Sequence, residues 1–150
     1  MRVLGFHILT GQLRYAVLEG TKETPMLIEK NRLIPVETAD VGEIMNWFET
    51  NFESILNRIN PNKVVYRLTL EPSKDQLINV EFPLGILNLI CYKRHIPTSY
   101  YSVMSYVPSK LGLPKGTDLY KHCDSKLGEH PPYWDKNQKN AILAAWFELP

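Results

Sequence analysis

Arg2-Val3-Leu4-Gly5-Phe6-His7, at the start of the chain, and Asn140-Ala141-Ile142-Leu143-Ala144-Ala145-Trp146, near its end, are the two stretches that decide the fold. The first is a nearly continuous apolar run, which is typical of a buried strand. The second is typical of a helix that turns Ile142, Ala145 and Trp146 toward a core. Strand-like and helix-like segments alternate between them, and this alternation predicts an α/β fold.

Length and composition predict one soluble domain over residues 1–150. The chain is 44% hydrophobic and 22% charged, and its net charge of +1 gives no general attraction to nucleic acid or membrane. No run of about 18 apolar residues exists, so we expect no membrane span. Cys91 and Cys123 fit no extracellular disulfide pattern, and we therefore expect free thiols and a cytoplasmic location.

The first half of the chain predicts three strands, a long helix and a fourth strand. The strands are expected at residues 2–9, 13–18, 26–36 and 63–70. Apolar residues recur at spacings of three and four between Ile44 and Ile59, which predicts an amphipathic helix. Thr38 or Asp40 could cap its start, and Pro61 prevents its continuation. Strand, helix and strand in succession predict a parallel crossover.

The second half predicts shorter elements. Residues 71–75 are expected to form a loop, and Pro83 argues against one unbroken helix through residues 71–83. A short apolar helix is expected at 84–92, and Ile96-Pro97-Thr98 leads into a fifth strand. Helices are then expected at 118–127 and at the end of the chain, where Asp135 or Asn137 could cap the last one.

This order of elements resembles the ribonuclease H-like superfamily, most closely its RuvC-type resolvase branch. Gly5 lies in register with the family's Gly-x-Asp opening strand, and Lys63-Val64-Val65-Tyr66-Arg67 is similar to the strand that delivers the second acidic residue. Asn140-Ala141-Ile142-Leu143-Ala144-Ala145 is similar to the closing Asp-Ala-x-x-x-Ala helix. The resemblance covers nearly the whole chain and implies a five-stranded mixed sheet, with strand 2 antiparallel, flanked by helices. A small bacterial family of unknown function with the same layout looks closer still.

The resemblance also implies that the nuclease site is degenerate. Active members hold two Mg²⁺ ions with three or four carboxylates, and the corresponding positions here are His7, Leu68 and Asn140. Imidazole is a softer, neutral ligand, leucine cannot ligate a metal, and asparagine offers one neutral oxygen, whereas Mg²⁺ prefers charged oxygens. We therefore expect a pseudo-nuclease without a metal cofactor.

A divergent metal-dependent nuclease is the main alternative. If Glu71 and Asp135 lay beside His7 and Asn140, a mixed histidine and carboxylate site could form and act catalytically. Such a site would suit Mn²⁺ or Zn²⁺ better than Mg²⁺. Both acids also have structural interpretations, because Glu71 precedes Pro72 in an expected loop and Asp135 is placed to cap a helix.

Basic and aromatic residues gather in the C-terminal part of the chain. Lysines interleaved with aromatic rings suit a phosphate backbone and stacked bases, but tyrosine and tryptophan also suit protein interfaces. We therefore expect DNA or RNA, a protein partner or a homodimer, and no membrane; in a scaffold hypothesis, part of the Ile44–Ile59 stripe is interfacial. The candidate nucleic-acid-binding residues are Lys93, Arg94, Lys110, Lys115, Lys136 and Lys139.

Overall fold

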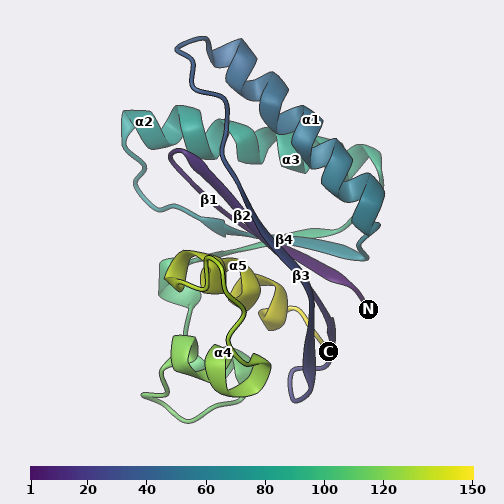
Figure 1. Cartoon of the computed structure of the whole chain (residues 1–150), viewed down its shortest axis with the longest axis vertical. Helices are drawn as coiled ribbons and strands as arrows, with labels where there is room; N and C mark the ends of the chain where they lie inside the picture. The colour runs from purple at the N-terminus through teal and green to yellow at the C-terminus, as the bar shows by residue number, and fades with distance from the viewer.

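A five-stranded sheet forms the centre of the computed structural model, which describes all residues from Met1 to Pro150 (Figure 1). The strands lie in the order β3-β2-β1-β4-β5. β2 is antiparallel to β1 and β3, whereas β1, β4 and β5 are parallel, which confirms the mixed sheet expected from the sequence. The strands are β1 (Val3–Leu9), β2 (Gln12–Gly20), β3 (Pro25–Leu33), β4 (Lys63–Leu68) and β5 (Thr98–Ser102).

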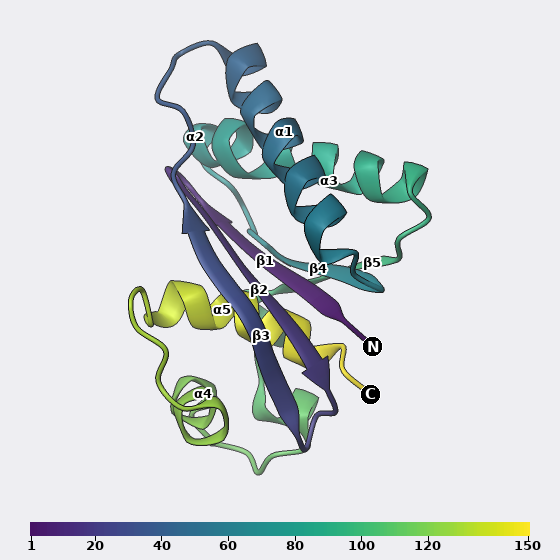
Figure 2. The ribbon, with the colours of Figure 1, turned by 45° about the vertical axis from the view of Figure 1, so that its right-hand side comes forward.

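Helices cover both faces of the sheet (Figure 2). α1 (Val41–Ile59) and α3 (Phe82–Lys93) pack on one face, and α5 (Lys136–Phe147) crosses the other, with α4 (Leu119–Leu127) beyond it. Asp40 caps α1 by accepting a hydrogen bond from the Glu43 backbone, and Asn60 ends it in a left-handed conformation. None of these helices combines the length and the apolar character needed to cross a lipid bilayer.

β1, β2 and β4 each contribute side chains to two separate cores, because successive side chains point to opposite faces of a sheet. Leu4, Phe6 and Ile8 of β1 belong to the core under α1 and α3. Val3 belongs to the core under α5, whose residues from Gln138 to Phe147 are all buried. Alternation therefore places Gly5 and His7 on the α5 face as well.

The segment before α3 is helical from Lys74 onward, so the loop expected over residues 71–75 ends at Ser73. α2 (Lys74–Gln76) continues through a π-helical turn, Leu77–Glu81, into α3. Ser73 starts the run with a reciprocal capping box to Gln76. The prediction that Pro83 breaks the helix was wrong, because the wide turn before it accommodates a residue that lacks a backbone N–H. β3 and β4 also end earlier than expected, at Leu33 and Leu68.

Most of the apolar stripe of α1 is buried inside the chain. Its side chains pack against the sheet and α3, as expected for an amphipathic helix on a sheet. Trp47, also part of the stripe, is only partly buried, and an interfacial role for part of the stripe stays a prediction. The buried stripe residues are Ile44, Phe48, Phe52, Ile55, Leu56 and Ile59.

Candidate functional site

A cleft lies where the carboxyl ends of β1 and β4 meet the first turns of α5. Its cavity has a volume of about 360 Å³. A neighbouring cavity of about 300 Å³ shares His7 and Thr69 with it. The positions inferred from the resemblance, His7, Leu68 and Asn140, therefore do converge on one site. The lining residues are His7, Arg67, Leu68, Thr69, Leu70, Val103, Asn137 and Asn140.

His7 stands between two arginines in one row across the sheet. Its partner on β2 is Arg14. On the other side Phe6 pairs with Tyr66 of β4, so the next residues along the parallel strands, His7 and Arg67, are neighbours. Paired residues share a sheet face, and this row Arg14–His7–Arg67 therefore faces α5.

Arg67, not Leu68, is the β4 side chain that shares the face of His7. Val65 packs in the core under α5, whereas Leu68 packs against the core under α1 and α3. Alternation along β4 then directs Arg67 toward the cleft. The sequence indicates this orientation, because Val65 and Arg67 are two residues apart and residues two apart in a strand share a face. The resemblance to the family pointed to position 68 instead.

His7 is a buried neutral imidazole. It is 9% exposed, and its Nδ1 atom has no hydrogen-bond partner. Burial, followed by the positive charges of Arg67 and Arg14, lowers the pKa of His7 to about 3. The His7 side chain thus carries no charge at neutral pH, and a cation flanks it on either side.

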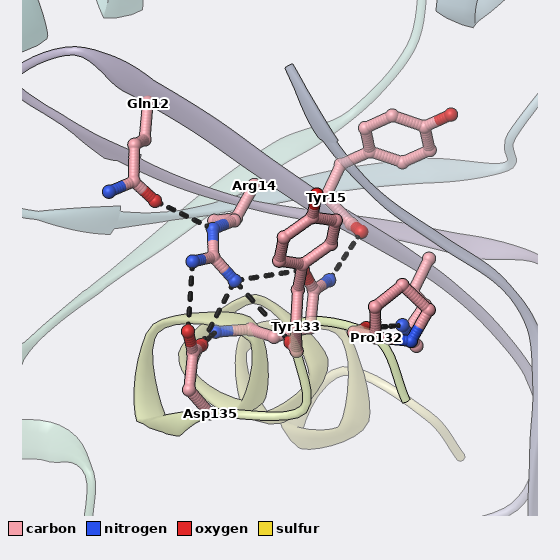
Figure 3. Close-up of polar contacts among 8 residues, drawn as sticks. Gln12, Arg14, Tyr15, Pro132, Tyr133 and Asp135 are labelled. Carbon is pink, nitrogen blue, oxygen red and sulfur yellow. Dashed lines mark hydrogen bonds and ion pairs between the residues drawn. The ribbon is translucent and has the colours of Figure 1, made fainter. Parts of the chain in front are cut away.

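Arg14 is neutralised by Asp135 (Figure 3). The guanidinium is 2% exposed, and its two terminal nitrogens each lie 2.9 Å from a carboxylate oxygen of Asp135. Burial alone would raise the pKa of Asp135, but hydrogen bonds from Arg14 and from the Gln138 backbone hold it below its usual range. Asp135 also caps α5, which confirms that helix-capping expectation. Both of its oxygens are therefore engaged away from the cleft centre.

Arg67 has no such partner. No carboxylate lies within ion-pairing distance of it, and its guanidinium carbon lies 4.8 Å from the centre of the Tyr106 ring. A cation over an aromatic face is stabilised by the ring but keeps its full charge. The cleft therefore holds one uncompensated positive charge.

Two tyrosines fix Asn140 in the cleft wall. Tyr106 donates a hydrogen bond to its backbone carbonyl at 2.9 Å, and Tyr120 donates one to its Oδ1 atom at 2.8 Å. The side-chain oxygen that could have served a metal is thus already an acceptor. The Nδ2 group, a donor, is the part left for a ligand.

The residues of the alternative metal site are not assembled around the cleft. Glu71 lies in an exposed loop with a φ of 48° and lines neither cavity, and Asp135 pairs with Arg14. No group of three or more histidines, cysteines, aspartates or glutamates is placed to hold a metal ion. The residues present do not fit the two-metal site that the fold family implies.

The six candidate nucleic-acid-binding residues are spread over several elements. Lys136, at the start of α5, lies beside the cleft, and its Nζ atom is 5.4 Å from the Tyr120 ring centre. Lys139 is buried and paired with Asp124 at 2.9 Å, and Arg94 pairs with Glu53. The other three form no ion pair; they are Lys93, Lys110 and Lys115.

Two basic residues that sequence reasoning missed border the same side of the molecule. Arg32 of β3 lies 4.2 Å from the ring centre of Tyr133, and Lys30 donates a hydrogen bond to the Pro132 carbonyl at 2.5 Å. Tyr133 is 47% exposed, and its ring lies 5.9 Å from the Arg14 guanidinium. In the sequence, the two-residue spacing of Lys30 and Arg32 indicates that they share one face of β3. Their proximity to the loop before α5 is evident only in the folded chain.

The sheet order, the antiparallel second strand and the placement of α5 define a ribonuclease H-like fold of the RuvC type. Thermus thermophilus RuvC in complex with a Holliday junction substrate matches with a TM-score of 0.79 at 15% identity, over 98% of this chain and 92% of that chain. The yeast mitochondrial Holliday junction resolvase Ydc2 matches with a TM-score of 0.69 at 13% identity, over 97% and 76%. Fowlpox virus resolvase with Holliday junction DNA matches with a TM-score of 0.59 at 14% identity, over 95% and 94%.

The likeness to these proteins is one of fold and not of sequence. No family model matches the chain, and no curated protein matches it by sequence. The closer similarity to a small bacterial family of unknown function therefore stays a prediction.

Proposed function

We propose that this chain is a catalytically silent RuvC-like domain that binds nucleic acid without cleaving it. One observation carries the proposal: Arg67 lines the cleft and no carboxylate does. Two-metal catalysis needs several negative oxygens to hold two divalent ions close together. A fixed guanidinium beside a neutral His7 repels such ions instead.

Nucleic acid is the partner that the surroundings of the cleft favour. Two of the structural relatives were solved with Holliday junction DNA, and this chain shares their fold. Lys136 over Tyr120 and Arg32 over Tyr133 place cations and aromatic rings together next to the cleft. Such pairs can contact phosphates and stack on bases.

Binding and cleavage can be measured in one experiment. A labelled four-way junction, duplex and single strand are incubated with the protein in Mg²⁺, Mn²⁺ or EDTA. We expect binding in all three buffers and no cleavage product. Lys136→Ala should weaken binding, and Lys22→Ala, in the turn between β2 and β3 at the end of the sheet away from the cleft, serves as the matched control.

The alternative, a divergent metal-dependent nuclease using His7, Glu71, Asp135 and Asn140, predicts the opposite result. Junction cleavage that requires Mn²⁺ or Mg²⁺ and disappears in His7→Ala would refute the catalytically silent domain and support the nuclease. Absence of binding to all three DNA forms would refute the nucleic-acid proposal.

A protein partner or a second copy of the chain is supported by a different surface. Four large apolar side chains are exposed along one run, α2 to α3, with 42% to 79% of their surface accessible: Leu77, Phe82, Leu89 and Tyr92. Such a patch is typical of an interaction site. If copies pair through it, Leu89→Lys should convert a dimer into a monomer in light scattering, whereas Leu70→Lys, equally exposed elsewhere, should not.

A further inference from the structure

The side chains of the cleft leave one net positive charge, which favours the binding of an anion. In the row Arg14–His7–Arg67 the first cation is neutralised by Asp135, the imidazole is neutral, and the last cation has no acidic partner. We propose that this cleft binds one phosphate-type oxyanion directly, without a metal, and that Arg67 supplies the charge. This inference rests on the proposed function and deepens it, because a backbone phosphodiester is the expected source of the oxyanion.

Side-chain amides line the cavity beside Arg67. The Nδ2 group of Asn140 is left free when Tyr120 donates to Oδ1. Asn137 lies one helical turn earlier on α5 and lines the same cavity, where its side chain also interacts with His7. These two amides and a guanidinium fork match the acceptor oxygens of a tetrahedral anion.

The buried side chain of His7 is an independent indication that the cleft binds a polar ligand. It is nine-tenths buried, lines both cavities, and has an unpartnered Nδ1 atom. A buried polar atom without a hydrogen bond is costly, and such atoms are uncommon in folded proteins. A bound oxyanion or its water shell would supply the missing contact.

The space and the helix orientation suit the same ligand. A cavity of about 360 Å³ holds an anion together with ordered water, since one water occupies roughly 30 Å³. Asn137 is in the first turn of the 12-residue helix α5, whose amino end carries a partial positive charge. Glu81, at the end of the π-helical turn, hydrogen-bonds to Thr69 and lines neither cavity.

The site is tested in two arms, both in EDTA. In the first arm, inorganic phosphate is titrated into isotope-labelled protein, and the side-chain NMR signals of Asn137, Asn140 and Arg67 Nε are followed. In the second arm, the affinity for a four-way junction is measured by fluorescence anisotropy for the parent chain and for Arg67→Gln. Lys22→Gln, in the turn between β2 and β3 at the end of the sheet away from the cleft, is the matched control for loss of one positive charge.

We expect phosphate to shift the three cleft signals and Arg67→Gln to weaken junction binding about tenfold, with Lys22→Gln within about twofold. Adding Mg²⁺ should not strengthen binding. Arg67→Lys keeps the charge but loses the planar fork, so it should lie between the parent and Arg67→Gln. Thermal melting of each variant confirms folding, and Arg67→Lys carries the test if Arg67→Gln is unfolded.

The outcomes separate this inference from the proposed function. DNA binding that is indifferent to both Arg67 variants, with no phosphate-induced shifts, overturns the anion site and leaves nucleic-acid binding intact. Phosphate-induced shifts without binding to any DNA form uphold the oxyanion site, assign it to free phosphate and overturn the proposed function. Phosphate or junction binding that appears only with Mg²⁺ overturns the metal-independent site.

Discussion

The backbone of Gly5 in β1 lies directly against that of Ala141 in α5. A Cβ atom at position 5 would come within 2.2 Å of the Ala141 carbonyl oxygen and 2.9 Å of the Ala145 nitrogen. Only hydrogen atoms fit there, so α5 can settle close to the sheet. This contact brings Asn140 to the cleft in which His7 lies, and it joins the start and end of the chain in one core.

Gly5→Ala should therefore be strongly destabilising. The methyl group cannot be accommodated without moving a helix backbone, and we expect the free energy of unfolding to fall by about 3 kcal/mol. Urea denaturation measures the change. Gly85→Ala in α3 is the control, because a Cβ there meets nothing within 4 Å and should stabilise the helix by up to about 1 kcal/mol. Equal stability of Gly5→Ala and the parent chain would contradict the packing described above.

Removing the two partners of the Arg14–Asp135 pair should have unequal effects. Asp135→Asn keeps a helix cap but leaves the buried guanidinium unpaired, which should cost about 3 kcal/mol. Arg14→Met leaves behind a carboxylate that is half exposed, so the loss should be smaller. Glu29→Gln, in the exposed pair with Arg58, should change stability by about 1 kcal/mol or less. Chemical denaturation of the three variants gives the ranking, and equal losses for Asp135→Asn and Glu29→Gln would refute it.

His7 should make the fold sensitive to mild acid. Its pKa is about 3 in the folded chain and about 6.5 in an unfolded chain. The unfolded state therefore takes up a proton first, so stability is complete above about pH 6.5 and falls toward pH 3, by up to about 1.4 kcal/mol per pH unit. Unfolding free energies between pH 7 and pH 5 measure the slope, which His7→Gln should reduce. A smaller slope should remain from His122, whose pKa burial also lowers.

Both cysteines should be inert in the native protein. Cys91 and Cys123 have no exposed surface, and burial raises their pKa values to about 11 and about 12. Because the thiolate is the reactive form, we expect no labelling by a thiol reagent at pH 8 and two labelled thiols in urea. Rapid labelling of one cysteine in native buffer would show that its core opens readily.

Local patterns were sufficient for most of the fold. The spacing of apolar residues in α1 and the apolar run of β1 depend on neighbours along the chain, and both elements were predicted. The helical run through Pro83 was missed because a single proline gives no information about a wide turn before it. An interfacial role for part of the α1 stripe stays a prediction, because amphipathicity does not say which surface an apolar stripe meets.

The candidate site could be predicted from the sequence only in part. His7, Leu68 and Asn140 were placed by resemblance, and the structure brings their positions together. Arg67 required the pairing register of β1 and β4, and the neutralisation of Arg14 required a contact across 121 positions of the chain. Charge compensation between distant residues leaves no mark in a local pattern.

The row of three side chains also limits what a single substitution could do in this cleft. An aspartate introduced at position 7 would find a guanidinium on each side and form salt bridges with them rather than recruit a divalent ion. A site for divalent ions here would require exchanging Arg67 as well, together with acids on α5.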